Sequence, residues 1–156
     1  MKAGDSNSEL RAKGRDRFER FLGAWSLLSC EHFPPGGTVL KPFGDFPRGL
    51  ILYQAGGCMS AQLSVGSLAV LASNDSLQAS VEEGFRVWRE YLGYWGTFEV
   101  FPEEGIVVHR VEGSSFPNWI ETEQIRHFRF DEDDRLTLEA DTPAGHFKLV
   151  WRKNAR

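Results

Sequence analysis

Residues 104–119, Glu-Gly-Ile-Val-Val-His-Arg-Val-Glu-Gly-Ser-Ser-Phe-Pro-Asn-Trp, contain a turn, a short strand and an aromatic corner in succession. Gly105 favours the turn, and the apolar alternation after it is typical of a strand with one buried face. Val107, His109 and Val111 share one face of that strand, and Arg110 and Glu112 share the other. Because Pro117 interrupts strand pairing, the chain turns there. The segment predicts one unit of an antiparallel sheet with an imidazole among branched apolar side chains.

Similar units flank this segment on both sides. Short apolar strands alternate with polar turns, which is the pattern of an antiparallel sheet that closes on itself. We therefore predict a mainly β fold, an up-and-down barrel with a leading helix and an internal helix. The expected strands cover about residues 24–32, 38–42 (an edge strand), 50–54, 58–63, 94–101, 106–113, 124–130, 135–140 and 146–152.

Two helices are predicted around these strands. Residues 9–22 are compatible with a helix that ends at Gly23, after a disordered tail over residues 1–8. In the internal helix an apolar stripe recurs at helical spacing, a capping box begins at Ser80, and Gly93 is the expected stop. We expect the stripe to pack on the barrel, with a partner-helix site as the alternative. Its members are Val81, Phe85, Trp88 and Leu92. Residues 9–156 then form a single domain.

Composition excludes several functional classes. The formal net charge is -4 and the basic residues are dispersed among acids, so nucleic acid is not an expected partner. No apolar run approaches the ~20 residues of a membrane helix. The N-terminus has no secretory signal, so we expect a cytoplasmic protein in which Cys30 and Cys58 are buried free thiols. The chain has 12 Phe and 5 Trp, and rings in this number suit a tight core or an apolar pocket.

Motifs for metals, cofactors and covalent catalysis are missing from the sequence. The four histidines are scattered, without zinc spacing, and the acidic turns lack the ligand spacing of a calcium loop. No glycine-rich phosphate loop precedes a helix, and no Gly-x-Ser-x-Gly or Cys-His signature occurs. We expect neither a metal nor a cofactor.

Gly23-Ala24-Trp25, at the start of the first strand, resembles the Gly-x-Trp of lipocalins. Over roughly residues 18–152 the chain resembles the lipocalin-like domain family of small calycin-type barrels from bacteria and fungi. The resemblance implies a calyx of about eight to ten strands with a ligand cavity. It also implies that Trp25 packs at the closed end, under Arg152 or Lys153. Some relatives belong to natural-product pathways, where related barrels act as cofactor-free isomerases or cyclases. The matching segments are residues 21–29, 42–44, 49–53, 57–63, 108–119, 126–130 and 136–138.

The polar groups of a candidate site lie on two neighbouring strands. Folding the hairpin about Pro117 and Asn118 places His109 near Arg126, within two residues of register. Desolvation and an adjacent cation both disfavour imidazolium, so a neutral His109 would accept a proton or bind a ligand oxygen. In the other interpretation His109 is a solvated or satisfied wall residue. The residues expected to contact the ligand are Tyr53, Met59, Phe98, Asn118, Trp119 and Phe128, with Trp119 equally suited to the rim or the core.

Three functions fit this sequence. The first is a calyx that binds a small apolar or amphipathic organic ligand. The second is a cofactor-free isomerase, cyclase or dehydratase, with His109 or Glu112 as acid/base and Arg126 stabilising an oxyanion. The third is a structural or interaction domain whose barrel is filled by its own side chains. The sequence leaves the ligand and the oligomeric state open.

Overall fold

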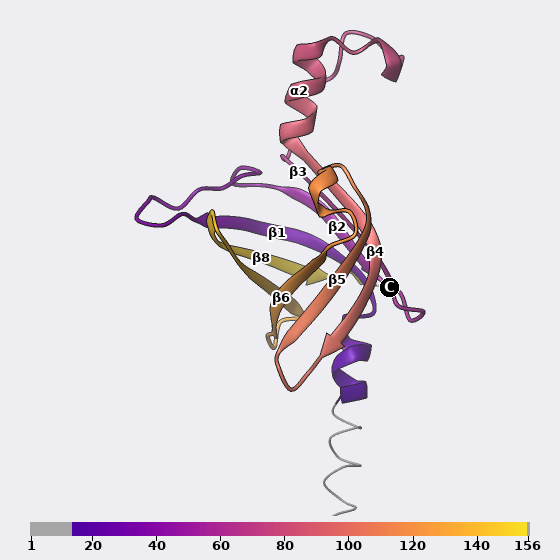
Figure 1. Cartoon of the computed structure of the whole chain (residues 1–156), viewed down its shortest axis with the longest axis vertical. Coiled ribbons are helices and arrows are strands. Elements are labelled where there is room, and N and C mark those ends of the chain that lie inside the picture. The colour runs from indigo at the N-terminus through magenta and orange to yellow at the C-terminus, as the bar shows by residue number, and fades with distance from the viewer. Residues whose placement is uncertain (1–13, 156) are drawn as a thin grey trace, which may run out of the picture.

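A computed structural model of the chain describes residues 14–155. Eight antiparallel strands pair in sequence order, and β1 pairs with β8 to close a barrel (Figure 1). The predicted mainly β, up-and-down barrel is therefore confirmed. The strands are β1 (Gly23–Phe33), β2 (Arg48–Tyr53), β3 (Cys58–Ser64), β4 (Tyr91–Phe101), β5 (Ile106–Ser114), β6 (Glu123–Phe130), β7 (Arg135–Thr142) and β8 (Gly145–Lys153). Single 3-10 turns, η1 (Ser76–Gln78) and η2 (Pro117–Trp119), lie in two of the connections.

Two boundaries differ from the sequence-based expectation. The predicted edge strand at 38–42 is reduced to one isolated bridge between His32 and Leu40. Gly93 does not stop a helix, because it lies inside β4 and pairs with Gln62 of β3. A Cβ atom at this position would lie 2.4 Å from Oε1 of Gln62, so glycine leaves the space that the Gln62 side chain occupies.

The internal helix α2 (Val81–Glu90) begins as predicted. Ser80 accepts a hydrogen bond from the Glu83 backbone N–H, and the Glu83 carboxylate accepts one from the Ser80 backbone N–H. The expectation that its apolar stripe packs on the barrel is wrong for Val81, Phe85 and Trp88, which are 84%, 58% and 52% exposed. The fourth member, Leu92, lies in β4 and packs against the core. Strand β4 starts directly after Glu90, so no loop returns the helix to the barrel wall, and α2 projects from one end (Figure 1).

The N-terminal helix, described over residues 14–21, lies at the opposite end of the barrel from α2 (Figure 1). Phe21 is fully buried, and its ring centroid lies 5.2 Å from Tyr53, 4.9 Å from Phe128 and 5.0 Å from Phe130. We call the part of the lumen that Phe21, Tyr53, Phe98, Phe128 and Phe130 fill the closed half. The predicted tail, 1–8, and the first residues of the predicted helix, 9–13, lie outside the described residues.

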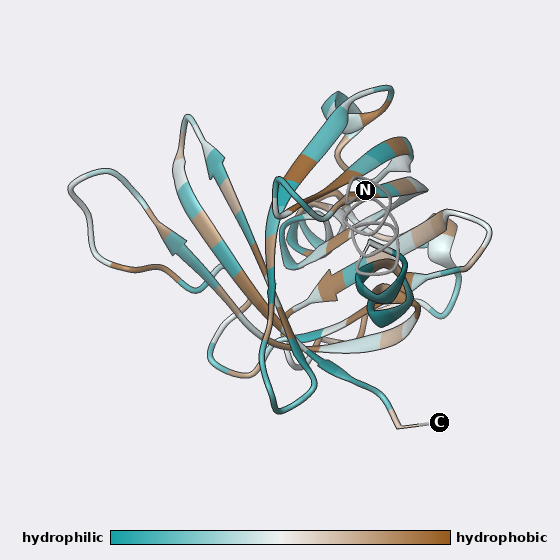
Figure 2. Ribbon diagram, turned by 90° about the horizontal axis from the view of Figure 1, so that it is seen from below, coloured by the Kyte–Doolittle hydropathy of each residue, from teal (hydrophilic) through white to brown (hydrophobic). Residues whose placement is uncertain are grey.

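Lys153 connects the N-terminal helix to the first strand at this end of the barrel. Its ammonium lies 4.3 Å from the centroid of the Trp25 ring and donates a hydrogen bond of 2.9 Å to the carbonyl of Arg20. The cation–π contact that the resemblance implied is therefore made by Lys153. Trp25 in turn donates its indole N–H to the carbonyl of Phe21 at 2.7 Å. Figure 2 views the barrel from this end and shows hydrophobic and hydrophilic residues alternating along the strands.

Candidate functional site

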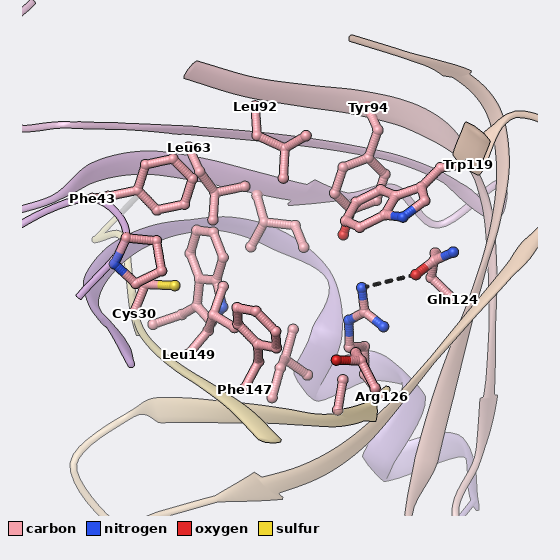
Figure 3. Close-up of a pocket in the computed structure, with 16 residues that line it drawn as sticks. Cys30, Phe43, Leu63, Leu92, Tyr94, Trp119, Gln124, Arg126, Phe147 and Leu149 are labelled. Carbon is pink, nitrogen blue, oxygen red and sulfur yellow. Dashed lines mark hydrogen bonds between the residues drawn. The ribbon is translucent and has the colours of Figure 1, made fainter. Parts of the chain in front are cut away.

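A cavity of about 280 Å³ occupies the rest of the lumen (Figure 3). We call this part the open half. Its wall is mainly aliphatic and aromatic, and Pro42 and Phe43 cover it from the connection between β1 and β2. The lining residues are Cys30, Pro42, Phe43, Ile51, Leu63, Leu92, Tyr94, Trp119, Gln124, Arg126, Leu138, Ala140, Thr142, Phe147, Leu149 and Trp151.

Small and aliphatic side chains leave this half empty. Cys30, Leu138 and Ala140 point into the lumen of the open half, whereas aromatic rings fill the lumen of the closed half. Burial, with a smaller effect of Glu31, raises the pKa of the Cys30 thiol to about 12, so this group stays neutral. Both cysteines are free, as predicted, but Cys58 is exposed and only Cys30 is buried, which corrects that part of the expectation.

His109 lies at the boundary between the two halves and is completely buried. Its Nε2 atom lies 2.9 Å from the hydroxyl of Tyr53, and its Nδ1 atom lies 3.0 Å from the hydroxyl of Tyr94. Tyr94 and His109 lie on the paired strands β4 and β5, and the curvature of the barrel brings Tyr53 of β2 to the same imidazole. Of the three, Tyr94 lines the cavity.

The surroundings of His109 hold the imidazole neutral. Burial, and then the positive charge of Arg126, lower the pKa of His109 from its ordinary 6.5 to about 3. Arg126 is two residues from the position directly opposite His109, because His109 pairs with Gln124 and Val107 with Arg126. The register between β5 and β6 therefore explains the predicted proximity of the two groups. The neutral imidazole has one N–H donor and one acceptor nitrogen.

A second, more open hollow of about 310 Å³ adjoins the cavity and shares Phe43, Leu92 and Trp119 with it. It lies between the last turn of α2 and the segment around η2, where the Trp88 indole donates to the carbonyl of Ser115 at 3.3 Å. Trp119 packs edge-on against Tyr94, with ring centroids 5.4 Å apart. Trp119 therefore lines both hollows, at the mouth of the cavity.

The structure separates the predicted site residues into four groups. Arg126 and Trp119 line the cavity, and His109 and Tyr53 lie behind its wall, connected to it through Tyr94. Glu112 is exposed on the outer face that β5 shares with Arg110, so its carboxylate does not join His109. Asn118 is exposed as well.

The remaining three predicted residues are not among those that line the cavity. Phe98 stacks on Phe18 at a centroid distance of 5.6 Å, and Phe128 packs on Phe21. Met59 is buried in the same core. These side chains point inward as expected, but the N-terminal helix occupies the space in front of the two phenylalanines.

Sequence reasoning missed Tyr94 as the group that connects His109 to the cavity. The signal was present, because Tyr94 shares the inner face of β4 with Gly96 and Phe98 by alternation. Gln124, Ala140 and Phe147 were missed too. Alternation predicts which side chains face the lumen, but it does not predict at which level along the barrel axis the lumen is empty.

Residues 14–155 contain no group of three or more His, Cys, Asp or Glu side chains placed to hold a metal ion. In the same part of the chain no helix has the length and hydropathy needed to cross a membrane. The polar groups that line the cavity among these residues belong to Arg126, Tyr94, Gln124, Thr142, the Cys30 thiol and the indoles of Trp119 and Trp151, and the buried indole N–H of Trp151 has no hydrogen-bond partner in this part of the chain.

Comparison with known proteins adds a family and one relative. Residues 22–154 match the family described as lipocalin-like domain. The 4'-hydroxy-3'-methoxypropiophenone carrier protein ppsC of Aspergillus oryzae is 34% identical over 110 residues, which cover 63% of this chain and 98% of that protein. Among solved structures, a redesigned β-barrel has a TM-score of 0.44 at 8% identity and covers 88% of this chain and 95% of its own. A variant of the fluorescent protein UnaG has a TM-score of 0.42 at 10% identity, with 88% and 99% covered.

Proposed function

This chain belongs to the lipocalin-like domain family, and from that premise we propose that it binds a small, largely apolar organic molecule in the open half of its barrel. The observation that carries the proposal is the cavity of about 280 Å³ with a mainly aliphatic and aromatic wall. Ligand sites of small molecules have this composition, with a few polar groups that fix orientation. A filled barrel, the structural alternative, would have no such space.

The cavity volume limits the size of the ligand. An apolar cavity of ~150 Å³ in another protein holds one benzene molecule. A space of about 280 Å³ is nearly twice as large, and it fits a substituted single ring or a fused pair of rings. The aromatic side chains Tyr94, Trp119, Phe147 and Trp151 offer ring faces and edges to such a ligand.

The relative from Aspergillus oryzae supports an aromatic ligand. That protein is named as a carrier of 4'-hydroxy-3'-methoxypropiophenone, a substituted aromatic ketone. We infer a ligand of the same size class for this chain, a secondary metabolite that is carried without being consumed.

A binding titration tests this function. We expect 4'-hydroxy-3'-methoxypropiophenone and naphthalene to quench the tryptophan fluorescence saturably and to compete for one site, since Trp119 and Trp151 line the cavity. Calorimetry provides the stoichiometry. If neither probe binds saturably, the proposed function is wrong.

An enzyme is the second candidate, and one observation favours it. The hydroxyl of Tyr94 reaches the cavity with His109 behind it and Arg126 beside it, which is an arrangement suited to stabilising an enolate oxygen. His109 has no direct access to the ligand, so any acid/base step attributed to it runs through Tyr94. Deuterium exchange at the carbon next to the ketone of the same probe, followed by NMR, separates the two. Exchange faster than in buffer indicates an enzyme, and unchanged exchange indicates a carrier.

A further inference from the structure

The guanidinium of Arg126 lies in the cavity wall without a carboxylate partner among residues 14–155. It donates to the carbonyl of Ile125 at 3.0 Å and to the side-chain oxygen of Gln124 at 3.3 Å, and its centre lies 5.9 Å from the Trp119 ring centroid. All three neighbours are neutral. The nearby carboxylate of Glu123 pairs with Arg110 on the outer face. The cavity therefore contains an uncompensated positive charge.

The hydrogen bonds around His109 determine what the Tyr94 hydroxyl offers to a ligand. A neutral imidazole donates from one nitrogen and accepts at the other. Tyr53 is 2% exposed, and within the described residues its hydroxyl has no hydrogen-bond partner except Nε2 of His109. A buried O–H without an acceptor is destabilising, and only the Tyr94 hydroxyl of the two faces the cavity, so Tyr53 donates to Nε2 and the imidazole proton resides on Nδ1.

It follows that the Nδ1–H of His109 donates to the oxygen of Tyr94. The proton of the Tyr94 hydroxyl is then available for an acceptor in the cavity. Figure 3 shows the Tyr94 hydroxyl and the Arg126 guanidinium pointing toward one another below Trp119. No Asp or Glu of the described part of the chain lines the cavity, and the Gln124 oxygen already accepts a hydrogen bond from Arg126. This corner of the cavity is positive and rich in donors.

We propose that the ligand presents an anionic oxygen, a carboxylate or a phenolate, to Arg126 and to the Tyr94 hydroxyl, with its apolar rings in the remaining cavity. The inference rests on the proposed binding function and adds the charge of the ligand. A guanidinium pairs with such an oxygen through charge-assisted hydrogen bonds, which are about twice as strong as neutral ones. Because Arg126 is half-buried in the cavity wall, the attraction is screened less than on the open surface.

Matched naphthalene probes test the charge requirement. We expect 2-naphthoate to bind about 10- to 100-fold more tightly than 2-naphthamide, which has the same shape without the charge. In Arg126→Met this preference disappears. Arg126→Lys keeps the charge and retains part of the preference. Arg129→Met is the matched control, because Arg129 lies on the same strand with an exposed side chain.

Further variants separate the two anionic groups and assign the donor. 2-Naphthol, titrated below and above its own pKa, gains affinity on ionisation if a phenolate fits, and the naphthoate preference identifies a carboxylate. Tyr94→Phe reduces either preference by about 10-fold, whereas Tyr91→Phe does not, since Tyr91 donates to Gln62 instead. Equal binding of charged and neutral probes, or a preference that survives in Arg126→Met, overturns this inference and leaves the binding function intact. If no naphthalene probe binds and 4'-hydroxy-3'-methoxypropiophenone does not bind either, the binding function itself fails.

Discussion

The two halves of the barrel lumen are built by the same eight strands and differ in what fills them. In the closed half the ring of Phe21 meets Tyr53, Phe128 and Phe130 edge-on at 4.9–5.2 Å, and the space is packed. In the open half Cys30, Leu138 and Ala140 leave a cavity of about 280 Å³. Backbone geometry is shared, so side-chain size and one helix outside the sheet determine where the lumen is empty. Stability should depend mainly on the closed half, and ligand binding on the open half.

Truncating the central ring of the closed half is expected to have the largest effect. Phe21→Ala removes a fully buried ring and leaves a void among aromatic neighbours. We expect the free energy of unfolding, measured with urea, to fall by ~3–5 kcal/mol. Phe46→Ala is the control, because Phe46 is 87% exposed and should change stability by less than ~0.5 kcal/mol. A loss below ~1 kcal/mol in Phe21→Ala would mean that this half is not the stabilising one.

His109, between the halves, makes stability depend on pH. Its pKa is about 3 in the folded protein against an ordinary 6.5, so between these values the unfolded chain binds the extra proton. The free energy of unfolding therefore decreases as pH falls through this window, by up to ~1.4 kcal/mol per pH unit from this residue. We expect His109→Gln to show a smaller slope between about pH 4 and pH 6. His127→Gln, which changes an exposed histidine, should keep the slope of the unaltered protein, and equal slopes in all three proteins would contradict this prediction.

Filling the open half should affect binding more than stability. Ala140→Phe puts a ring into the cavity, where the space to accept it already exists. We expect the affinity for naphthalene to fall by ~10-fold or more, with a change in unfolding free energy of less than ~1 kcal/mol. The same substitution in an exposed turn, Ala144→Phe, should leave binding unchanged. If Ala140→Phe binds naphthalene normally, the ligand lies elsewhere.

The smallest effect on stability is expected for Lys153, which contacts Trp25 and the N-terminal helix at the end of the closed half. Lys153→Met removes a cation from the Trp25 ring and a donor from the carbonyl of Arg20. We expect thermal unfolding to show a loss of ~1 kcal/mol, together with weaker attachment of the N-terminal helix. Arg152→Met, beside it on the exposed face, should have no measurable effect.

The sequence predicted the barrel because alternation and turn residues are local signals. The capping box at Ser80 and the inward face of His109 are local in the same way. The proximity of His109 and Arg126 followed from one hairpin, which needs only the register between neighbouring strands. These are the features that short-range patterns determine.

Features that depend on distant segments were not predictable in this way. Tyr53 and His109 lie on strands that are not neighbours in the sheet, so their contact appears only when the barrel closes. Phe98 and Phe128 have the inward direction of ligand-contacting residues, but a helix far away in the chain covers them. The exposed stripe of α2 was missed because periodicity shows an apolar face and not what lies against it.

The residues that close the end of the barrel opposite α2 are not part of the sheet that forms its wall. They are Phe18 and Phe21, which precede β1 and take part in no strand pairing. Removing residues up to Phe21 would therefore break no ladder of the sheet, yet it would uncover the rings of Tyr53, Phe98 and Phe128 at this end of the barrel. A helix remote from the cavity would then determine how well the aromatic layer beneath the proposed ligand site stays packed.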